Sequence, residues 1–256
     1  MANSASVILA TYNEAENIGP MIEAVSTLLS SRDFEIIVVD DDSPDLTWRK
    51  VEVIALTNLR VRLIRRQNER GLTSAYQAGI RVATKDVLVW LDCDFQHPVS
   101  LMPVLLQMID GGLDAALTSR FLPSVESGRE ESKQLVRRLQ VVSTLLLNRL
   151  GTLLVDRRIT DWTSGYLAIR RSVLDGYRLI GGHGEYYIHL MHHVAAGGYR
   201  FKEIPYTVGV REKGMAKTSA SLSQFVRYGV KYVMIFLQAA WHRRAVSASQ
   251  NRDRSK

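Results

Sequence analysis

The first 120 residues alternate between short apolar runs and stretches with helical periodicity. The apolar runs predict strands at Ser6–Thr11, Phe34–Val39, Val61–Arg65, Val87–Leu91 and Ala115–Ser119. The stretches between them predict a first helix ending near Ser30 and further helices at Leu46–Ala55, Leu72–Ala83 and Leu101–Ile109. Parallel strands need crossover connections, and these spacings leave room for one helix between each pair. The pattern therefore predicts an α/β fold with a mixed, mostly parallel sheet flanked by helices.

The pattern changes after Arg120. A polar loop follows, and then a long helix-like stretch at Lys133–Leu154 whose many Leu and Val residues predict more than one apolar face. A further short strand is predicted at Leu167–Arg170, and later short elements end at Pro205 and Val210.

Two carboxylates directly follow the apolar run at Val87–Leu91. Side chains alternate along a strand, so we expect Asp92 and Asp94 at its end to share one face, roughly 6–7 Å apart, with Cys93 on the other. Hard cations such as Mg²⁺ or Mn²⁺ bind carboxylate oxygens and complete their shell with substrate phosphates. This turn is therefore a candidate site for a divalent cation and a phosphorylated ligand.

A second acidic cluster, Asp40–Asp42, follows the strand at Phe34–Val39. Such a cluster also occurs in solvated turns, where it caps the next helix. However, the carboxyl ends of parallel strands meet at one edge of the sheet, which is where open α/β folds bind ligands. We therefore expect the two acidic clusters to converge on one ligand.

These segments together resemble family 2 glycosyltransferases of the GT-A fold, in particular the dolichol- or polyprenol-phosphate mannose synthases. The resemblance extends from Val7 to about Trp241. It rests on six motifs, which are Thr11-Tyr12-Asn13-Glu14, Asp40-Asp41-Asp42-Ser43-Pro44-Asp45, Asp92-Cys93-Asp94-Phe95-Gln96-His97-Pro98, Ser119-Arg120, Thr163-Ser164-Gly165-Tyr166 and the basic segment 211–217.

The resemblance implies roles for the motif residues on the donor side. The nucleotide would lie against Thr11, Tyr12, Glu14, Asp40 and Asp42, with Asp92 and Lys217 also contacting the donor. Mg²⁺ or Mn²⁺ would be held by Asp92, Asp94 and Gln96, and would neutralise the departing diphosphate. The implied donor is GDP-mannose.

The implied acceptor is a polyprenyl (dolichyl) monophosphate. Because a phosphate monoester is already anionic, it needs cationic residues to orient it and no general base. Arg120, Arg137 and Arg138 are the candidate phosphate ligands. Arg211 and Lys217 lie in a segment that resembles the family's lid over the donor, and Asp94, Arg120 and Arg211 are the implied catalytic residues.

The basic charge is concentrated toward the C-terminus. The chain carries a net charge of +7, and residues 200–256 contain 12 Lys and Arg against 3 Asp and Glu. This region includes an apolar helical stretch, Phe225–Trp241, whose aromatic and basic residues are typical of a helix in an anionic membrane interface. It lacks a recognisable nucleic-acid-binding motif, so nucleic acid is not expected as a partner.

The predicted organisation is a GT-A domain at 1–210 with an amphipathic helical insertion at 133–155. A basic lid and interface helix would follow at 211–244, and a disordered tail at 245–256. Neither a membrane-spanning segment nor a signal peptide is expected. The single cysteine fits a reducing compartment. We therefore expect peripheral attachment at the cytoplasmic face of a membrane, with a small membrane-anchoring subunit as a further partner.

Three alternatives remain open at this stage. A UDP-sugar could replace GDP-mannose, because guanine and uracil both offer groups that Asp40 or Glu14 could bind. A hydroxyl acceptor would require a carboxylate base, for which Asp161 is the best candidate. A non-catalytic interaction protein could retain the fold, although the carboxylates of the Asp92–Asp94 turn and Arg120 are all present.

Overall fold

A computed structural model describes residues 2–122, 135–209 and 229–241, and gives the backbone alone for 135–140. The strands are β1 (Ala5–Thr11), β2 (Phe34–Asp40), β3 (Val61–Arg65), β4 (Val87–Trp90), β5 (Ala115–Ser119), β6 (Leu167–Arg170) and β7 (Phe201–Pro205). The helices are α1 (Ile18–Leu28), α2 (Thr47–Thr57), α3 (Leu72–Val82), α4 (Met102–Asp110), α5 (Leu135–Leu154) and α6 (Glu185–Ala196), with short 3₁₀ turns at Val99–Leu101 and Arg171–Leu174.

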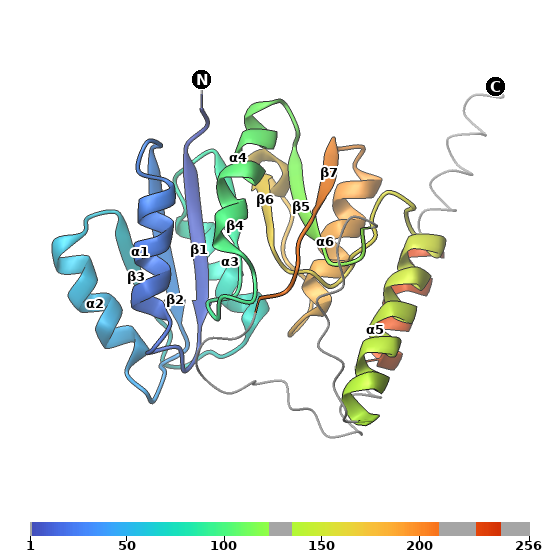
Figure 1. The fold of residues 1–256 in the computed structure, drawn as a ribbon, viewed down its shortest axis with the longest axis horizontal. Helices are drawn as coiled ribbons and strands as arrows, with labels where there is room; N and C mark the ends of the chain where they lie inside the picture. Colours follow the sequence, from blue (N-terminus) through green and yellow to red (C-terminus); the bar gives the residue numbers. More distant parts are fainter. Residues whose placement is uncertain (1, 123–134, 210–228, 242–256) are drawn as a thin grey trace.

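The strands form one mixed sheet in the order β3-β2-β1-β4-β6-β5-β7 (Figure 1). Strands β1 to β4 are parallel to one another where they pair, and β5 pairs in parallel with β7. Only β6 runs antiparallel to its described neighbours, β4 and β5. The predicted α/β fold with a mostly parallel sheet is therefore confirmed.

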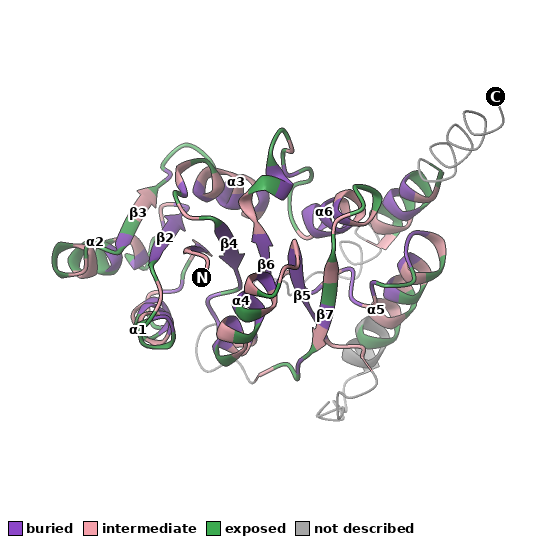
Figure 2. Ribbon diagram, turned by 90° about the horizontal axis from the view of Figure 1, so that it is seen from above, coloured by how far each residue is buried: buried purple, intermediate pink, exposed green. Residues whose placement is uncertain are grey.

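Helices cover both faces of the sheet (Figure 2). The buried residues of α1, α2 and α4 pack on one face, and those of α3 and α6 pack on the other. β1, β2 and β4 are buried at nearly every position, as expected of strands covered on both sides. Tyr186 and Tyr187 belong to this core. The half-buried His189 and His193 lie on α6.

Strand β4 ends earlier than the sequence predicted. Its last residue is Trp90, so Asp92 and Asp94 lie in a turn and their positions do not follow strand alternation. Two contacts close this turn: the Asp94 carboxylate accepts the Gln96 N–H, and the ring of His97 accepts the Asp92 N–H. Phe95 adopts a left-handed conformation with φ of 62°, which bends the chain between them.

Helix α5 stands beside the α6 and β7 end of the sheet, next to a helical segment at 229–241 (Figure 1). Gly151 allows the two helices to approach closely, because a Cβ at this position would lie 2.6 Å from Phe236 and 2.7 Å from Trp162. Lys231 forms an ion pair with the buried Glu185 at the start of α6. Segment 229–241 is therefore docked on the domain by both apolar and charged contacts.

The outer faces of these two helices expose several large apolar side chains, together with Arg149 on α5 and Lys231 and Gln238 on 229–241. On α5 the exposed residues include Val142, Leu146 and Leu153, and on 229–241 they include Val230, Met234, Leu237 and Trp241. The second set repeats at spacings of three and four residues, which places it along one face of its helix. Among the described helices, none is long and apolar enough to cross a bilayer.

Candidate active site

The loops that follow β1, β2 and β4 meet at one edge of the sheet, as the sequence predicted. Asp40 lies at the centre of this edge and is completely buried. One carboxylate oxygen accepts the Ser43 N–H at 2.8 Å, and the other accepts the hydroxyls of Thr11 and Ser43 at 2.8 and 2.7 Å. Asp40 therefore holds the first two loops together and presents no carboxylate surface to a ligand in this arrangement.

The next carboxylate, Asp41, anchors a loop that the sequence analysis did not identify. It accepts the Arg66 Nε–H at 2.7 Å and the Gly71 N–H at 2.8 Å. Gly71 has a φ of 136°, a conformation that L-residues rarely adopt. Asp41 therefore brings the start of α3 to the same edge of the sheet. In the sequence, Arg66 directly after β3 is the signal that could have identified this loop.

Two aromatic rings with arginine partners line the rim of this edge. Asp42 is paired with Arg65 at 2.6 Å, and the Arg65 guanidinium stacks 3.5 Å from the centre of the Trp48 ring. Tyr12 is half-buried, with Arg70 5.1 Å from its ring centre. Glu14 is buried nearby and accepts the Asn17 amide at 2.7 Å. The rim therefore offers flat surfaces and hydrogen-bonding groups suited to a planar base and a ribose.

The Asp92–Asp94 turn combines an exposed carboxylate with a buried one. The Asp92 side chain is 55 % exposed, whereas Asp94 is buried and half-buried Gln96 follows. Mg²⁺ commonly binds through one or two carboxylates and completes its shell with phosphate and water. The oxygen donors of this turn fit that requirement. Cys93, between the two carboxylates, is buried.

His97 joins this turn to the loop after Asp161. Its Nδ1 accepts the Asp92 N–H at 3.1 Å, which assigns the proton to Nε2, and Nε2 lies 3.1 Å from the Ser164 carbonyl oxygen. The ring packs between Tyr166 and Tyr206, with ring centres 5.4 and 5.6 Å away. The acidic turn and the Asp161–Gly165 loop are therefore held as one unit.

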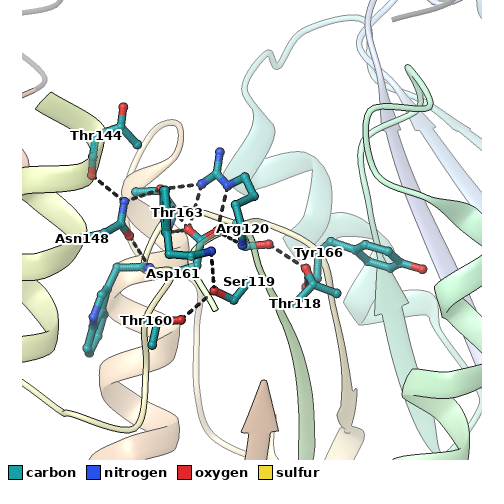
Figure 3. A network of polar contacts seen from close by, with 12 residues as sticks. Thr118, Ser119, Arg120, Thr144, Asn148, Thr160, Asp161, Thr163 and Tyr166 are labelled. Carbon is teal, nitrogen blue, oxygen red and sulfur yellow. Dashed lines mark hydrogen bonds and ion pairs between the residues drawn. The ribbon is translucent and has the colours of Figure 1, made fainter. Parts of the chain in front are cut away.

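Arg120 follows β5 and is fixed on the other side of this loop (Figure 3). Asp161 is completely buried and accepts the Arg120 Nε and Nη2 groups at 2.7 and 2.8 Å, and the Arg120 backbone N–H at 3.0 Å. Nη2 also donates to the Thr163 hydroxyl at 2.8 Å. The two-pronged edge of the guanidinium is therefore directed at Asp161. Within the described part of the chain, Nη1 donates no hydrogen bond, and 25 % of the side chain is exposed.

The contact between Arg120 and Asp161 shifts the pKa of both groups. Burial alone would raise the pKa of Asp161, but the charge and hydrogen bonds of Arg120 outweigh burial and lower it. Burial would likewise lower the pKa of Arg120, and Asp161 instead raises it. Because Asp161 is enclosed and ionised, it is poorly suited to remove a proton from a hydroxyl acceptor.

Two polar residues missed by the sequence analysis support this pair. Glu203 on β7 accepts the Thr160 and Asp161 N–H groups at 2.9 and 3.1 Å, and burial raises its pKa. Asn148 on α5 accepts the Trp162 N–H at 2.6 Å. Neither residue belongs to a motif that the sequence analysis recognised.

Several predicted site residues cannot be compared with this geometry. Arg137 and Arg138 lie on α5, but their side chains are outside the described residues. Arg211 and Lys217, with the predicted lid and tail, also lie outside them. Their roles remain predictions.

The order and direction of the strands are those of the GT-A fold. Glucosyl-3-phosphoglycerate synthase from Mycobacterium tuberculosis, solved with Mn²⁺, uridine diphosphate and phosphoglyceric acid, matches with a TM-score of 0.69. The match covers 93 % of this chain and 78 % of that one at 18 % identity. More specifically, the chain belongs to glycosyl transferase family 2, whose model matches residues 6–178.

Similar curated proteins are named for sugar transfer to lipid phosphates. The chain is 35 % identical to a dolichol-phosphate mannosyltransferase from Pyrococcus furiosus, over 87 % of this chain and 62 % of that protein. It is 34 % identical to a polyprenol monophosphomannose synthase from Mycolicibacterium smegmatis, over 84 % and 81 %. It therefore spans less than two thirds of the first relative's length but about four fifths of the second's.

Proposed function

We propose that this protein transfers mannose from GDP-mannose to a polyprenyl (dolichyl) monophosphate, with inversion at the anomeric carbon. The main structural support is the position of the acidic Asp92–Asp94 turn and of Arg120 on either side of one hydrogen-bonded loop, which His97 and Asp161 hold. Such a site pairs a place for a metal-bound diphosphate with a fixed cation for a second anion. The names of the similar mannosyltransferases support the same sugar and acceptor class.

The donor would occupy the edge formed by β1, β2 and β4. Its base and ribose would contact Tyr12 and Glu14, and Asp40 would act indirectly by fixing Thr11 and Ser43. Asp92, Asp94 and Gln96 would hold Mg²⁺ or Mn²⁺ with the diphosphate. When bound, the cation would stabilise negative charge on the leaving group. Arg211 and Lys217 would complete the donor site.

The acceptor phosphate would be oriented by Arg120, with Arg137 or Arg138 as a second contact. An anionic phosphate oxygen attacks the anomeric carbon and forms the new C–O bond, while the bond to the diphosphate oxygen breaks and GDP leaves with the electron pair. No proton has to be removed from the acceptor. This agrees with the enclosed, ion-paired state of Asp161, which leaves it unsuitable as a base.

The lipid tail of the acceptor would reach the site along α5 and segment 229–241. Their outer faces expose Leu146, Leu153, Leu237 and Trp241, while the inner face of α5 carries polar residues that bind the Asp161–Gly165 loop. Apolar side chains outside and polar side chains inside are typical of a helix that faces lipid. We infer that these helices lie in the interface of a membrane, at its cytoplasmic face, where a small anchoring subunit could assist.

The membrane surface is tested by placing a charge on it. Leu146→Glu and Leu237→Glu should each weaken co-sedimentation with anionic vesicles by about tenfold, because each prevents burial of one large apolar side chain. Leu56→Glu is the matched control, since Leu56 is at least as exposed as Leu146 and Leu237 but lies on α2. Equal binding by all three variants would contradict the assignment of this face.

The reaction is tested with purified protein, a polyprenyl phosphate, Mg²⁺ or Mn²⁺, and sugar-labelled GDP-mannose or UDP-hexoses. Label extracted into organic solvent from GDP-mannose alone would support the proposal. Label from a UDP-sugar would keep the reaction class and change the donor. Lack of lipid product with every donor, in the presence of membranes that supply an anchoring subunit, would overturn it.

A further inference from the structure

One face of α5 carries a row of polar residues, Thr144, Asn148 and Thr152, at helical spacing. Asn148 lies in the middle and is only 2 % exposed, whereas the exposed residues of this helix include Leu146 and Leu153. A buried amide carries a desolvation cost unless its groups are hydrogen-bonded. Its partners therefore indicate what it does.

Asn148 contacts the loop that orients Arg120 (Figure 3). Its Oδ1 accepts the Trp162 N–H at 2.6 Å, and its Nδ2 donates to the Thr144 carbonyl at 2.8 Å and to the Thr163 hydroxyl at 3.2 Å. The side chain thus uses the acceptor and both donor hydrogens on the helix and on two consecutive loop residues.

The Thr163 hydroxyl lies between Asn148 and the arginine. It accepts from Arg120 Nη2 at 2.8 Å and from Asn148 Nδ2 at 3.2 Å, and it donates to the Asp161 carboxylate at 3.2 Å. A hydroxyl has one donor hydrogen and two acceptor lone pairs, so these three contacts occupy it fully. The contact with Asn148 therefore helps to fix the orientation of the Thr163 hydroxyl, and with it the lone pair that accepts from Arg120.

We propose that Asn148 is a positioning residue for the acceptor phosphate, acting on Arg120 through the Thr163 hydroxyl. Asn148 lies on the helix that we place against lipid. A shift of α5 relative to the domain would therefore change the contact that orients the Arg120 guanidinium. Asn148 itself touches no substrate. The inference rests on the proposed transfer to a lipid phosphate and adds to it a residue without a family motif.

The test compares Asn148→Ala, Thr163→Val and the double variant in steady-state transfer to polyprenyl phosphate. Loss of one hydrogen bond that orients Arg120 should raise the acceptor KM by about 3–10-fold in Asn148→Ala, with the donor KM unchanged. If Asn148 acts through Thr163, the double variant should have the same acceptor KM as Thr163→Val, because residues in one network are not additive.

Thr152→Val is the matched control. Thr152 lies one turn further along the same face, and its hydroxyl lies 2.7 Å from the Ile159 carbonyl and 2.9 Å from the backbone carbonyl of Asn148. Its loss therefore weakens the attachment of α5 but removes none of the contacts of the Asn148 side chain, Thr163 or Arg120. It should lower the melting temperature and leave the acceptor KM unchanged. If Asn148→Ala does not fold, Asn148→Asp replaces it, since it keeps the oxygen for Trp162 and loses the donor to Thr163.

Two outcomes would overturn the inference while wild-type protein is active. One is an acceptor KM in the Asn148 variant no higher than in Thr152→Val. The other is a double variant in which the two single effects multiply. Lack of product from wild-type protein would instead count against the proposed function, so the two failures are distinguishable.

Discussion

Arg120→Ala should reduce transfer to polyprenyl phosphate by about 10²–10³-fold, because it removes a fixed positive charge from the acceptor side of the reaction. It should also destabilise the protein by about 3–5 kcal/mol, because Asp161 would remain as a buried carboxylate without its cation. Product formation and chemical denaturation of the same preparation measure the two effects.

In Arg120→Ala, the contribution of Asp161 to the free energy of unfolding should also change its direction with pH. In wild-type protein the folded-state pKa of Asp161 is lowered, so its contribution is fully present above the unfolded value of about 3.9 and is lost as the pH falls through the folded value. Without the Arg120 side chain, burial is opposed only by the remaining hydrogen bonds from the residue 120 N–H and from Thr163, so we expect that pKa to rise. Stability relative to wild type should then fall as the pH rises from about 4 through the raised value.

Arg158→Ala provides the control for this result. Arg158 makes the same two-pronged contact with a buried carboxylate, Asp156, but its own side chain is 57 % exposed and lies away from the strand-end site. The Arg158→Ala variant should retain activity, and its stability should depend on pH much as that of wild type does, since solvent screens the Arg158–Asp156 pair. The charge of Asp161 also raises the pKa of Glu203, so the difference between the variants measures the two neighbouring carboxyl groups together. Full activity in Arg120→Ala would contradict its role with the acceptor.

The regular parts of the fold could be predicted because their signals are local. The strands at Val61–Arg65, Ala115–Ser119 and Leu167–Arg170 were predicted at the observed residues, since each is a short apolar run bounded by polar or turn residues. The convergence of the acidic loops followed from parallel strand direction alone. Neither prediction required knowledge of a particular side-chain contact.

The roles within the acidic cluster could not be predicted in the same way. Asp40, Asp41 and Asp42 are chemically identical neighbours, yet one is enclosed, one anchors the Gly71 loop and one pairs with Arg65. These differences arise from partners distant in the sequence. The end of β4 was also mispredicted, because a side-chain contact from His97 closes the turn.

Asn148 and Glu203 illustrate the limit of motif reasoning. Neither residue belongs to a motif, and each becomes informative only when its burial and hydrogen bonds are known. Residue type and spacing identify groups that meet a ligand. They do not identify the residues that hold those groups in place.

Asp94→Asn should lower the transfer rate by about 10²–10³-fold, because it removes a negative charge from the proposed cation site. The substitution is isosteric, and the amide oxygen can still accept the Gln96 N–H that closes the turn at 3.0 Å in wild type. The turn should therefore persist, with a change in stability below about 0.5 kcal/mol. Transfer rates across a Mn²⁺ titration measure the effect, and the half-saturating Mn²⁺ concentration should rise.

Asp110→Asn is the matched control for the loss of one carboxylate. Asp110 pairs with Arg32 at 2.6 Å, which lowers its pKa to about 2, and it lies at the C-terminal end of α4 with no contact to the acidic turn. Its replacement should reduce stability and leave the Mn²⁺ dependence unchanged, the reverse of the result for Asp94→Asn. If Asp94→Asn reaches the wild-type rate at every Mn²⁺ concentration, Asp94 is not a ligand of the cation, and the diphosphate site must be sought elsewhere along the strand ends.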